Sequence, residues 1–196
     1  MKVIKRNGRT EELDISKIKK FTGDAVAGLE NVSLSELEVD AKIQFRDMIT
    51  TEEIQQTLIK TAVDKIDIDR PNWTFVAARL FLYDLYHKVS GFTGYQSLQT
   101  YFERGESEGR IMLGLKEKYD LDDLDAYIKP ERDLQFTYLG IKTLYDRYLI
   151  KDRQAKPIEL PQHMFMAIAM FLAQNELDSQ GWAKKFYDLI SKFEVI

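Results

Sequence analysis

The chain has 196 residues with a formal net charge of −4, and its pI near 5.4 gives no global attraction to nucleic acid or anionic lipid. It contains no cysteine, which excludes disulfides, thiolate metal sites and thiol chemistry within these residues. Its 44% hydrophobic and 31% charged residues are typical of a globular protein of one large or two small domains.

Membrane insertion is not indicated by the sequence. The longest apolar run, Met164 to Ala173, has ten residues, about half of the ~20 that a bilayer span needs. The N-terminus lacks the apolar core of a signal peptide. We therefore expect a cytoplasmic protein with neither a membrane nor a nucleic-acid partner.

The first seventeen residues predict a β-hairpin that leads into a helix. Asn7-Gly8 separates two extended runs, and both residue types accept the positive φ of a type I′ turn. We predict strands over Val3–Arg6 and Thr10–Leu13. Asp14 stands at the N-cap of a helix whose apolar residues recur to Leu29. Because an isolated hairpin is marginally stable in water, helices must cover it.

Capping boxes predict two further helix starts. Ser33 is followed by Glu36 and Thr50 by Glu53, in each case with the spacing at which side chain and backbone cap each other. Apolar periodicity continues from each start, and a later helix before Gly91 is apolar on most sides, which places it in the middle of a bundle. The helices predicted in this part are 33–45, 50–66 and 72–89.

The remainder of the chain predicts a second helical domain. Gly91 and Gly94 end the apolar pattern, so we place the domain boundary there, with domains 1–92 and 93–196. The segment 161–176 is apolar all round and needs partners on every side. The fold class is mainly α: a four-helix bundle capped by a small hairpin, followed by a helical domain. Its later elements are helices 134–148, 161–176 and 181–193, with a loop or short hairpin over 149–159.

The hairpin and the first helix carry an unusual set of polar residues. Two or three cations stand close in sequence to two carboxylates, and this composition suits a nucleoside phosphate. The cations and exposed helix N–H groups could take the phosphates, while a carboxylate reads an adenine amino group or a ribose hydroxyl. The alternative is an ordinary solvated surface. The residues are Lys5, Arg6, Glu11, Asp14 and Lys17.

Other catalytic or metal motifs are absent from the sequence. Neither a P-loop nor a G-x-G-x-x-G run occurs, which argues against a P-loop ATPase or a Rossmann dehydrogenase. The two histidines, His87 and His163, are far apart and lack a second ligand at helical spacing, so we expect no metal site. His163 is expected to pack against the apolar helix. His87 and Lys88 are expected to complement a helix dipole near its C-terminus.

The run from Val3 to Ile18 resembles the opening of an ATP-cone, the regulatory nucleotide-binding domain at the N-terminus of many ribonucleotide reductase large subunits. Later segments follow in the family's order, and three more resemble the helical lead-in to the catalytic barrel of a class I large subunit. The cone segments are Ile43-Gln44-Phe45, Ile49-Thr50-Thr51-Glu52-Glu53-Ile54, Leu58-Ile59-Lys60-Thr61-Ala62 and Ala77-Ala78-Arg79-Leu80. The lead-in segments are Phe136-Thr137-Tyr138, Lys151-Asp152-Arg153 and Phe186-Tyr187-Asp188.

The resemblance implies particular ligand contacts at the hairpin. Lys5 and Arg6 match positions that hold the phosphates and the adjacent backbone. Glu11 and Asp14 match adenine and ribose contacts, although relatives often carry Asn where this chain has Asp14. Lys17 matches a cation beside the sugar and phosphates.

Four further positions match the family's site on the third and fourth helices. Thr51 matches a hydroxyl that touches the triphosphate, and it also stands at a predicted helix N-terminus, which favours an anion. Gln55 stands where some relatives have histidine. His87 replaces a frequent lysine, and Lys88 is the alternative cation.

The resemblance therefore implies the allosteric region of a class I ribonucleoside-diphosphate reductase large subunit. ATP as activator or dATP as inhibitor would bind, with Mg²⁺. The implied partners are the rest of the large subunit and the radical-bearing small subunit, in a homo-oligomer of the full-length protein. Without cysteines this segment should be inactive alone. The alternatives are a cone-containing transcriptional regulator, for which the sequence offers neither a basic surface nor a zinc ribbon, or a helical interaction module that binds no nucleotide.

Overall fold

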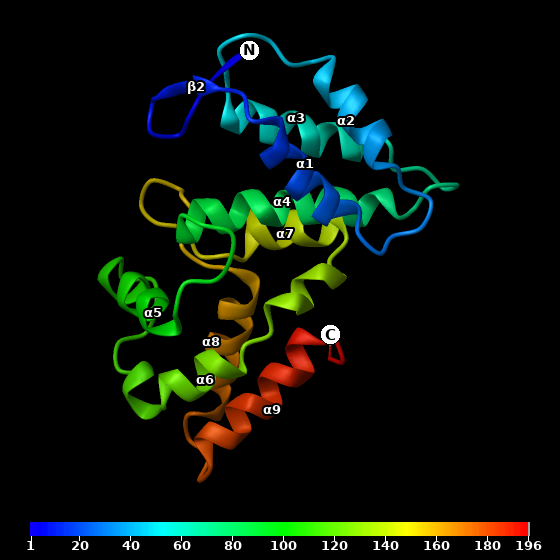
Figure 1. Ribbon diagram of the computed structural model, residues 1–196. Coiled ribbons are helices and arrows are strands. Elements are labelled where there is room, and N and C mark those ends of the chain that lie inside the picture. Colours follow the sequence, from blue (N-terminus) through cyan, green and yellow to red (C-terminus); the bar gives the residue numbers. More distant parts are fainter. Residues whose placement is uncertain (196) are drawn as a thin grey trace. The chain divides into compact units, whose positions relative to one another are not determined.

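The computed structural model describes residues 1–195. The chain folds into two compact units, one of Met1–Asp84 with Leu134–Lys142 and the other of Leu85–Asp133 with Thr143–Ile196. Both are mainly helical, and the only sheet within the described residues lies in the first (Figure 1). The predicted class, a small N-terminal sheet with helices followed by a helical domain, is confirmed. The predicted division at residues 92 and 93 stays a prediction.

The sheet has three strands in the order β2-β1-β3. β1 (Lys2–Ile4) pairs antiparallel with β2 (Thr10–Glu12) and parallel with β3 (Ile49–Thr50), which sets Ile4 opposite Thr50. The sequence predicted the first two strands and missed the third. A strand of two residues has no alternating pattern to detect, and its partner lies more than forty residues away in the chain.

The hairpin turn differs from the predicted type. Both predicted strands are shorter than expected, and β1 ends at Ile4 instead of Arg6. The Gly8 N–H donates to the Lys5 carbonyl and the Lys5 N–H to the Arg9 carbonyl, each at 2.8 Å. Within the turn only Gly8 has a positive φ, 80°, so the type I′ prediction was wrong and the geometry is that of a turn closed by a glycine bulge. Arg6 consequently lies in the turn.

Four helices complete the first unit, although the last of them continues into the second. As predicted, Asp14 caps the first helix by accepting the Ser16 N–H at 3.0 Å. Thr50 and Glu53 form both bonds of a capping box, at 3.0 and 2.8 Å. The helices are α1 (Ile15–Val26), α2 (Leu34–Lys42), α3 (Thr51–Val63) and α4 (Trp73–Ser90).

The predicted capping box at α2 is only half formed. The Ser33 side chain accepts the Glu36 N–H at 3.2 Å, but the Glu36 carboxylate instead pairs with Lys65 at 2.8 Å and Arg70 at 3.0 Å. A charge-assisted bond to two cations is stronger than a bond to one backbone N–H. α2 and α3 also end three residues before their predicted ends.

The core of the first unit lies between the sheet and the helices. Val3 and Ile49, from the paired strands β1 and β3, are 2% and 3% exposed. α4 buries residues on most of its sides, as its composition predicted. The helices contribute Leu37, Leu58, Trp73, Val76 and Leu80 to the same hydrophobic core.

The second unit consists of helices with short connections. α8 packs along α9, and an isolated bridge between Lys151 and Pro157 confirms a short hairpin in the segment 149–159. The helix predicted from residue 134 begins at Tyr138, because residues up to Gln135 form a 3-10 turn. The helices are α5 (Leu98–Ser107), α6 (Leu121–Tyr127), α7 (Tyr138–Arg147, shared with the first unit), α8 (Pro161–Ala173) and α9 (Ser179–Ser191), with 3-10 turns at Lys116–Lys118 and Pro130–Gln135.

α8 is the most apolar helix of the second unit, and it buries only part of its surface. Phe165 and Met170 are 5% and 0% exposed, whereas Ile168, Phe171 and Leu172 are 41–55% exposed. The sequence predicted packing partners on every side of this helix. Among residues 1–195, other residues cover only one side of it.

We predict that limited chymotrypsin digestion cuts first at Phe92. This residue is 50% exposed and follows α4 in a segment of bends between two glycines with positive φ, and such backbone opens easily. Mass spectrometry of the early fragments tests this expectation. Earlier cleavage within Thr51–Val63 would contradict the compact first unit.

Candidate functional site

The parallel pairing of β1 and β3 brings two of the predicted site residues together. Because Ile4 lies opposite Thr50 and neighbouring strands are about 4.8 Å apart, Lys5 and Thr51 leave the sheet at the same end. Thr51 is the first residue of α3, and free N–H groups at a helix N-terminus favour an anion. The sheet therefore sets a lysine beside a helix N-terminus.

Lys5 is close to a second predicted residue across the hairpin. Its Nζ lies 3.5 Å from Glu11 Oε2, and the two side chains are 28% and 51% exposed. An ion pair this exposed contributes little to stability, about 0–1 kcal/mol. Both side chains can therefore reorient toward a ligand at small cost.

Asp14 and Lys17 lie at the other end of the hairpin. The Leu13 N–H donates to the Met1 carbonyl at 2.9 Å, so α1 begins beside the start of β1. A hydrogen bond from the Ser16 side chain holds the pKa of Asp14 below its usual value, and Lys17 Nζ lies 3.9 Å from Asp14 Oδ2. At about 3.3 Å per residue, this end is roughly 13 Å from Lys5.

Arg6 pairs with a residue that the sequence analysis missed. Its Nη2 lies 2.8 Å from Oδ1 of Asp84, whose side chain is 3% exposed, whereas that of Arg6 is 43% exposed. Gln56 Nε2 donates to Asp84 Oδ2 at 3.4 Å. The available signal was an aspartate inside the otherwise apolar stretch Leu80–Leu85 of the predicted fourth helix, where a buried charge requires a partner.

The remaining predicted residues are placed differently. Gln55 is buried, and its Nε2 donates to the Leu80 carbonyl at 2.7 Å, which joins α3 to α4. His87 and Lys88 lie in the last turn of α4 and belong to the second unit, where His87 Nε2 is 3.0 Å from Thr93 Oγ1. The first unit thus gathers six predicted residues around the hairpin, which we call the hairpin strip: Lys5, Arg6, Glu11, Asp14, Lys17 and Thr51.

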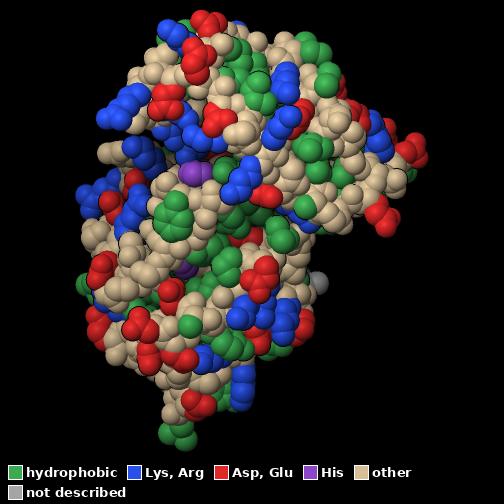
Figure 2. Space-filling view, in the orientation of Figure 1, with side chains coloured by type: hydrophobic (Ala, Val, Ile, Leu, Met, Phe, Trp, Pro, Cys, Tyr) green, Lys and Arg blue, Asp and Glu red, His purple; other side chains and the backbone are tan. Residues whose placement is uncertain are grey.

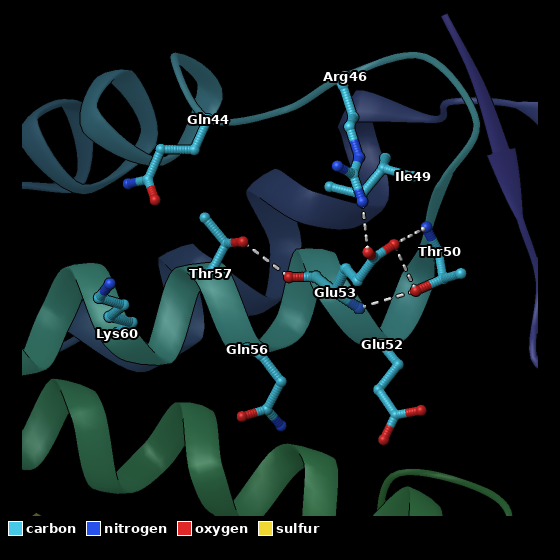
Figure 3. Close-up of a pocket in the computed structure, with 9 residues that line it drawn as sticks. All are labelled: Gln44, Arg46, Ile49, Thr50, Glu52, Glu53, Gln56, Thr57 and Lys60. Atoms are coloured by element: carbon cyan, nitrogen blue, oxygen red, sulfur yellow. Dashed lines mark hydrogen bonds and ion pairs between the residues drawn. The ribbon is translucent and has the colours of Figure 1, made fainter.

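A polar groove of about 550 Å³ lies along α3, and none of the nine predicted residues lines it (Figure 3). Of its two cations, Arg46 is paired with Glu53 at 2.8 Å, and the Thr50 backbone N–H lowers the pKa of Glu53. Because two carboxylates, Glu52 and Glu53, line the groove beside Arg46 and Lys60, the groove carries no excess positive charge for an anion. Its lining is Gln44, Arg46, Ile49, Thr50, Glu52, Glu53, Gln56, Thr57 and Lys60.

Two buried carboxyl groups stand out in the second unit. Asp133 is fully buried and accepts hydrogen bonds from Tyr86, Tyr95 and Gln162 at 2.6–2.7 Å, and burial raises its pKa to about 6. Glu159 accepts from the Tyr101 hydroxyl and from a backbone N–H, and burial raises its pKa to about 7.

His163 completes this buried polar set. Its ring stacks on Tyr101 with centroids 4.8 Å apart, Nε2 lies 3.0 Å from the Gln96 carbonyl, and burial lowers its pKa to about 3. The predicted packing role of His163 is therefore confirmed. The buried carboxylates of Asp133 and Glu159 accept hydrogen bonds from protein donors, as is usual for polar groups with a structural role in a core.

Comparison with known sequences identifies the two parts of the chain. Residues 1–88 match the ATP cone domain, and residues 134–196 match the all-alpha domain of ribonucleotide reductase. The chain therefore carries a cone followed by a reductase helical domain.

The relatives place these domains in one protein family. The chain is 71% identical over 194 residues to the ribonucleoside-diphosphate reductase subunit alpha of Helicobacter pylori (strain ATCC 700392 / 26695), covering 99% of this chain and 25% of the relative. It is 34% identical over 200 residues to the ribonucleoside-diphosphate reductase 1 subunit alpha of Escherichia coli (strain K12), covering 98% and 26%. The chain belongs to the alpha subunits of ribonucleoside-diphosphate reductase and spans about a quarter of the length of these relatives.

None of the helices within residues 1–195 combines the length and the hydropathy that a membrane span requires. Over the same residues no three acidic, histidine or cysteine side chains are grouped as metal ligands. Figure 2 shows acidic and basic side chains interspersed over the visible face, in keeping with the small net charge.

We predict that the free energy of unfolding of the second unit falls between pH 5.5 and 7.5. The raised pKa values of Asp133 and Glu159 mean that the folded state binds more protons than the unfolded state from about pH 4 to 7, so stability decreases as pH rises. His163, with its lowered pKa, acts oppositely below about pH 6.5. Two carboxyl groups outweigh one histidine, and the net loss should be about 1 kcal/mol.

Urea unfolding of the chain at the two pH values measures this loss. Glu159→Gln should flatten the dependence, while the exposed Asp122→Asn in the same unit should leave it unchanged. Stability that stays constant or rises over this range would contradict the assignment.

Proposed function

We propose that the first unit binds ATP or dATP and acts as the allosteric effector region of a class I reductase large subunit. The observation that supports this most strongly is the pairing of Ile4 with Thr50, because it puts Lys5 beside the N-terminus of α3 and Arg6 next in the turn. The match of residues 1–88 to the ATP cone domain agrees with this function.

The geometry of the hairpin strip suggests an orientation for the nucleotide. We assign the phosphates to Lys5, Arg6 and Thr51, with the first N–H groups of α3. Glu11 lies beside Lys5 and Asp14 lies toward the other end, and we assign the adenine and the ribose to these two carboxylates. A nucleoside triphosphate has its charge at one end and its base at the other, and we orient its phosphates toward the end of the strip where Lys5 and Arg6 adjoin the N-terminus of α3.

Three further contacts complete the proposal. Lys17, 3.9 Å from Asp14, is assigned to the sugar and phosphates. His87 and Lys88 remain candidate phosphate contacts, and Gln55 acts by holding α3 to α4. Mg²⁺ would be held by the phosphates and water, since it commonly binds through few protein ligands.

The cellular role follows from the family. We propose that effector binding here controls the activity of the complete large subunit in deoxyribonucleotide synthesis in the cytoplasm. The partners proposed for that protein are the remainder of the large subunit, the radical-bearing small subunit and further copies of itself. The reduction itself belongs to parts of the large subunit outside this chain, because thiol chemistry needs cysteines that this chain lacks.

We predict that MgATP and MgdATP raise the melting temperature of the chain. A ligand that binds only the folded state stabilises it by about 2.7 kcal/mol at a hundredfold excess over Kd, which is roughly 5–10 °C for a chain of this size. Adenosine should shift it much less, because the phosphates supply the charge-assisted bonds. Differential scanning fluorimetry measures these shifts.

Lys5→Glu should remove most of the shift without unfolding the free protein, since surface substitutions usually change stability by no more than about 0.5 kcal/mol. Lys19→Glu is the matched control: it makes the same charge change at an exposed position about 200° around α1 from Lys17. If millimolar dATP produces no shift, the first unit is an interaction module and the proposal is wrong.

We also predict that the pure chain hydrolyses no ATP and reduces no ribonucleotide. The sequence has no P-loop to cradle the phosphates for hydrolysis and no cysteine for thiol chemistry. Phosphate release and deoxyribonucleotide formation are measured against a protein-free blank. Turnover that copurifies with the chain through two chromatographic steps would refute this prediction.

A further inference from the structure

The Arg6–Asp84 pair lies at the junction of three elements of the first unit. Arg6 comes from the hairpin turn, Asp84 from α4, and Gln56 from α3, with Nη2 and Nε2 lying 2.8 and 3.4 Å from the two oxygens of the carboxylate. Figure 3 shows the Gln56 side chain pointing from α3 toward α4. Arg6 and Gln56 both contact the carboxylate, which is almost inaccessible to solvent.

The pair alters what Arg6 offers to an anion. Arg6 is 43% exposed, so its guanidinium is both in contact with a buried carboxylate and reachable from solvent. A carboxylate at hydrogen-bond distance offsets the positive charge that a phosphate would otherwise meet. Because Asp84 is buried, water screens its charge poorly, and it repels a nearby phosphate more strongly than a surface aspartate would.

A complete exchange of partners is unfavourable for this pair. Removing Arg6 would take a cation at 2.8 Å away from a buried carboxylate, and separating the partners of such a pair is unfavourable. A guanidinium carries five N–H donors in a planar fork, so Arg6 can keep Asp84 on one nitrogen and present others to the ligand. Asp84 therefore stays beside the phosphates when they bind.

We propose that Asp84 is a built-in counter-ion of the nucleotide site, which weakens the hold of Arg6 on the phosphates and so sets the effector concentration to which the site responds. This inference rests on the proposed function. It names a residue that opposes binding, in contrast to the cations of the hairpin strip that favour it. An effector site must empty when the nucleotide concentration falls, and excess positive charge would prevent that.

The test is isothermal titration of the chain with MgATP, with magnesium tripolyphosphate as a phosphate-only probe. Asp84→Asn removes the charge while keeping the shape and an acceptor for Arg6, and Kd for both probes should fall at least about fivefold, as expected for one unit charge near a protein surface. Asp84→Glu keeps the charge and should bind as the unsubstituted chain does. Asp84→Ser is a second neutral variant in case the amide disturbs folding.

Two controls separate this role from others. Asp24→Asn makes the same change in net charge at an exposed position on α1, about 15 Å along the helix from Asp14, and should leave Kd unchanged. Arg6→Gln should weaken binding, and adding Asp84→Asn to it should restore part of the affinity. A merely structural tether would instead make Asp84→Asn bind more weakly and the double variant no better than Arg6→Gln.

The outcomes are distinct. Tighter binding by the two neutral variants, with Asp24→Asn unchanged, supports the proposal. Equal or weaker binding by Asp84→Asn and Asp84→Ser, while the unsubstituted chain binds, overturns this inference alone. No binding of either probe by the unsubstituted chain overturns the proposed function, and this inference with it.

Discussion

The parallel pairing of β1 with β3 is the interaction on which the first unit depends. It joins residues 3–4 to residues 49–50, and the chain between them contains β2, α1 and α2. A two-stranded hairpin alone is marginally stable, whereas here its buried Val3 packs beside Ile49 in the core. The same pairing aligns the exits of β1 and β3, so one contact both anchors the sheet and places Lys5 beside α3.

Charge balance is the second constraint on this unit. Cations that could attract phosphate are each close to a carboxylate: Lys5 to Glu11, Arg6 to Asp84 and Lys17 to Asp14. The first and last of these pairs are exposed and weak, so a ligand can displace them. The buried carboxylate cannot reorient in that way, which makes Asp84 different in kind from Glu11 and Asp14.

The features that could be predicted from the sequence are those set by residues close together in the chain. Asp14 and Thr50 were recognisable as helix caps because a cap is defined by neighbouring residues, and the apolar periodicity of α4 gave its central position. β3 could not be predicted, since two residues carry no period and the pairing is set by tertiary contacts. Asp84 was missed for the same reason: its role depends on Arg6, 78 residues earlier in the chain. Six of the nine predicted site residues surround the hairpin, and their contact with nucleotide stays a prediction.

Hydrogen–deuterium exchange with and without MgdATP tests the central claim most directly, because it reports on each segment of the chain separately. Nucleotide should slow exchange in residues 2–18 and in the first turns of α3, which supply the proposed backbone donors, and leave α8 and α9 unchanged. Protection confined to the polar groove residues 56–60, or none around the hairpin at saturating dATP, would contradict the account.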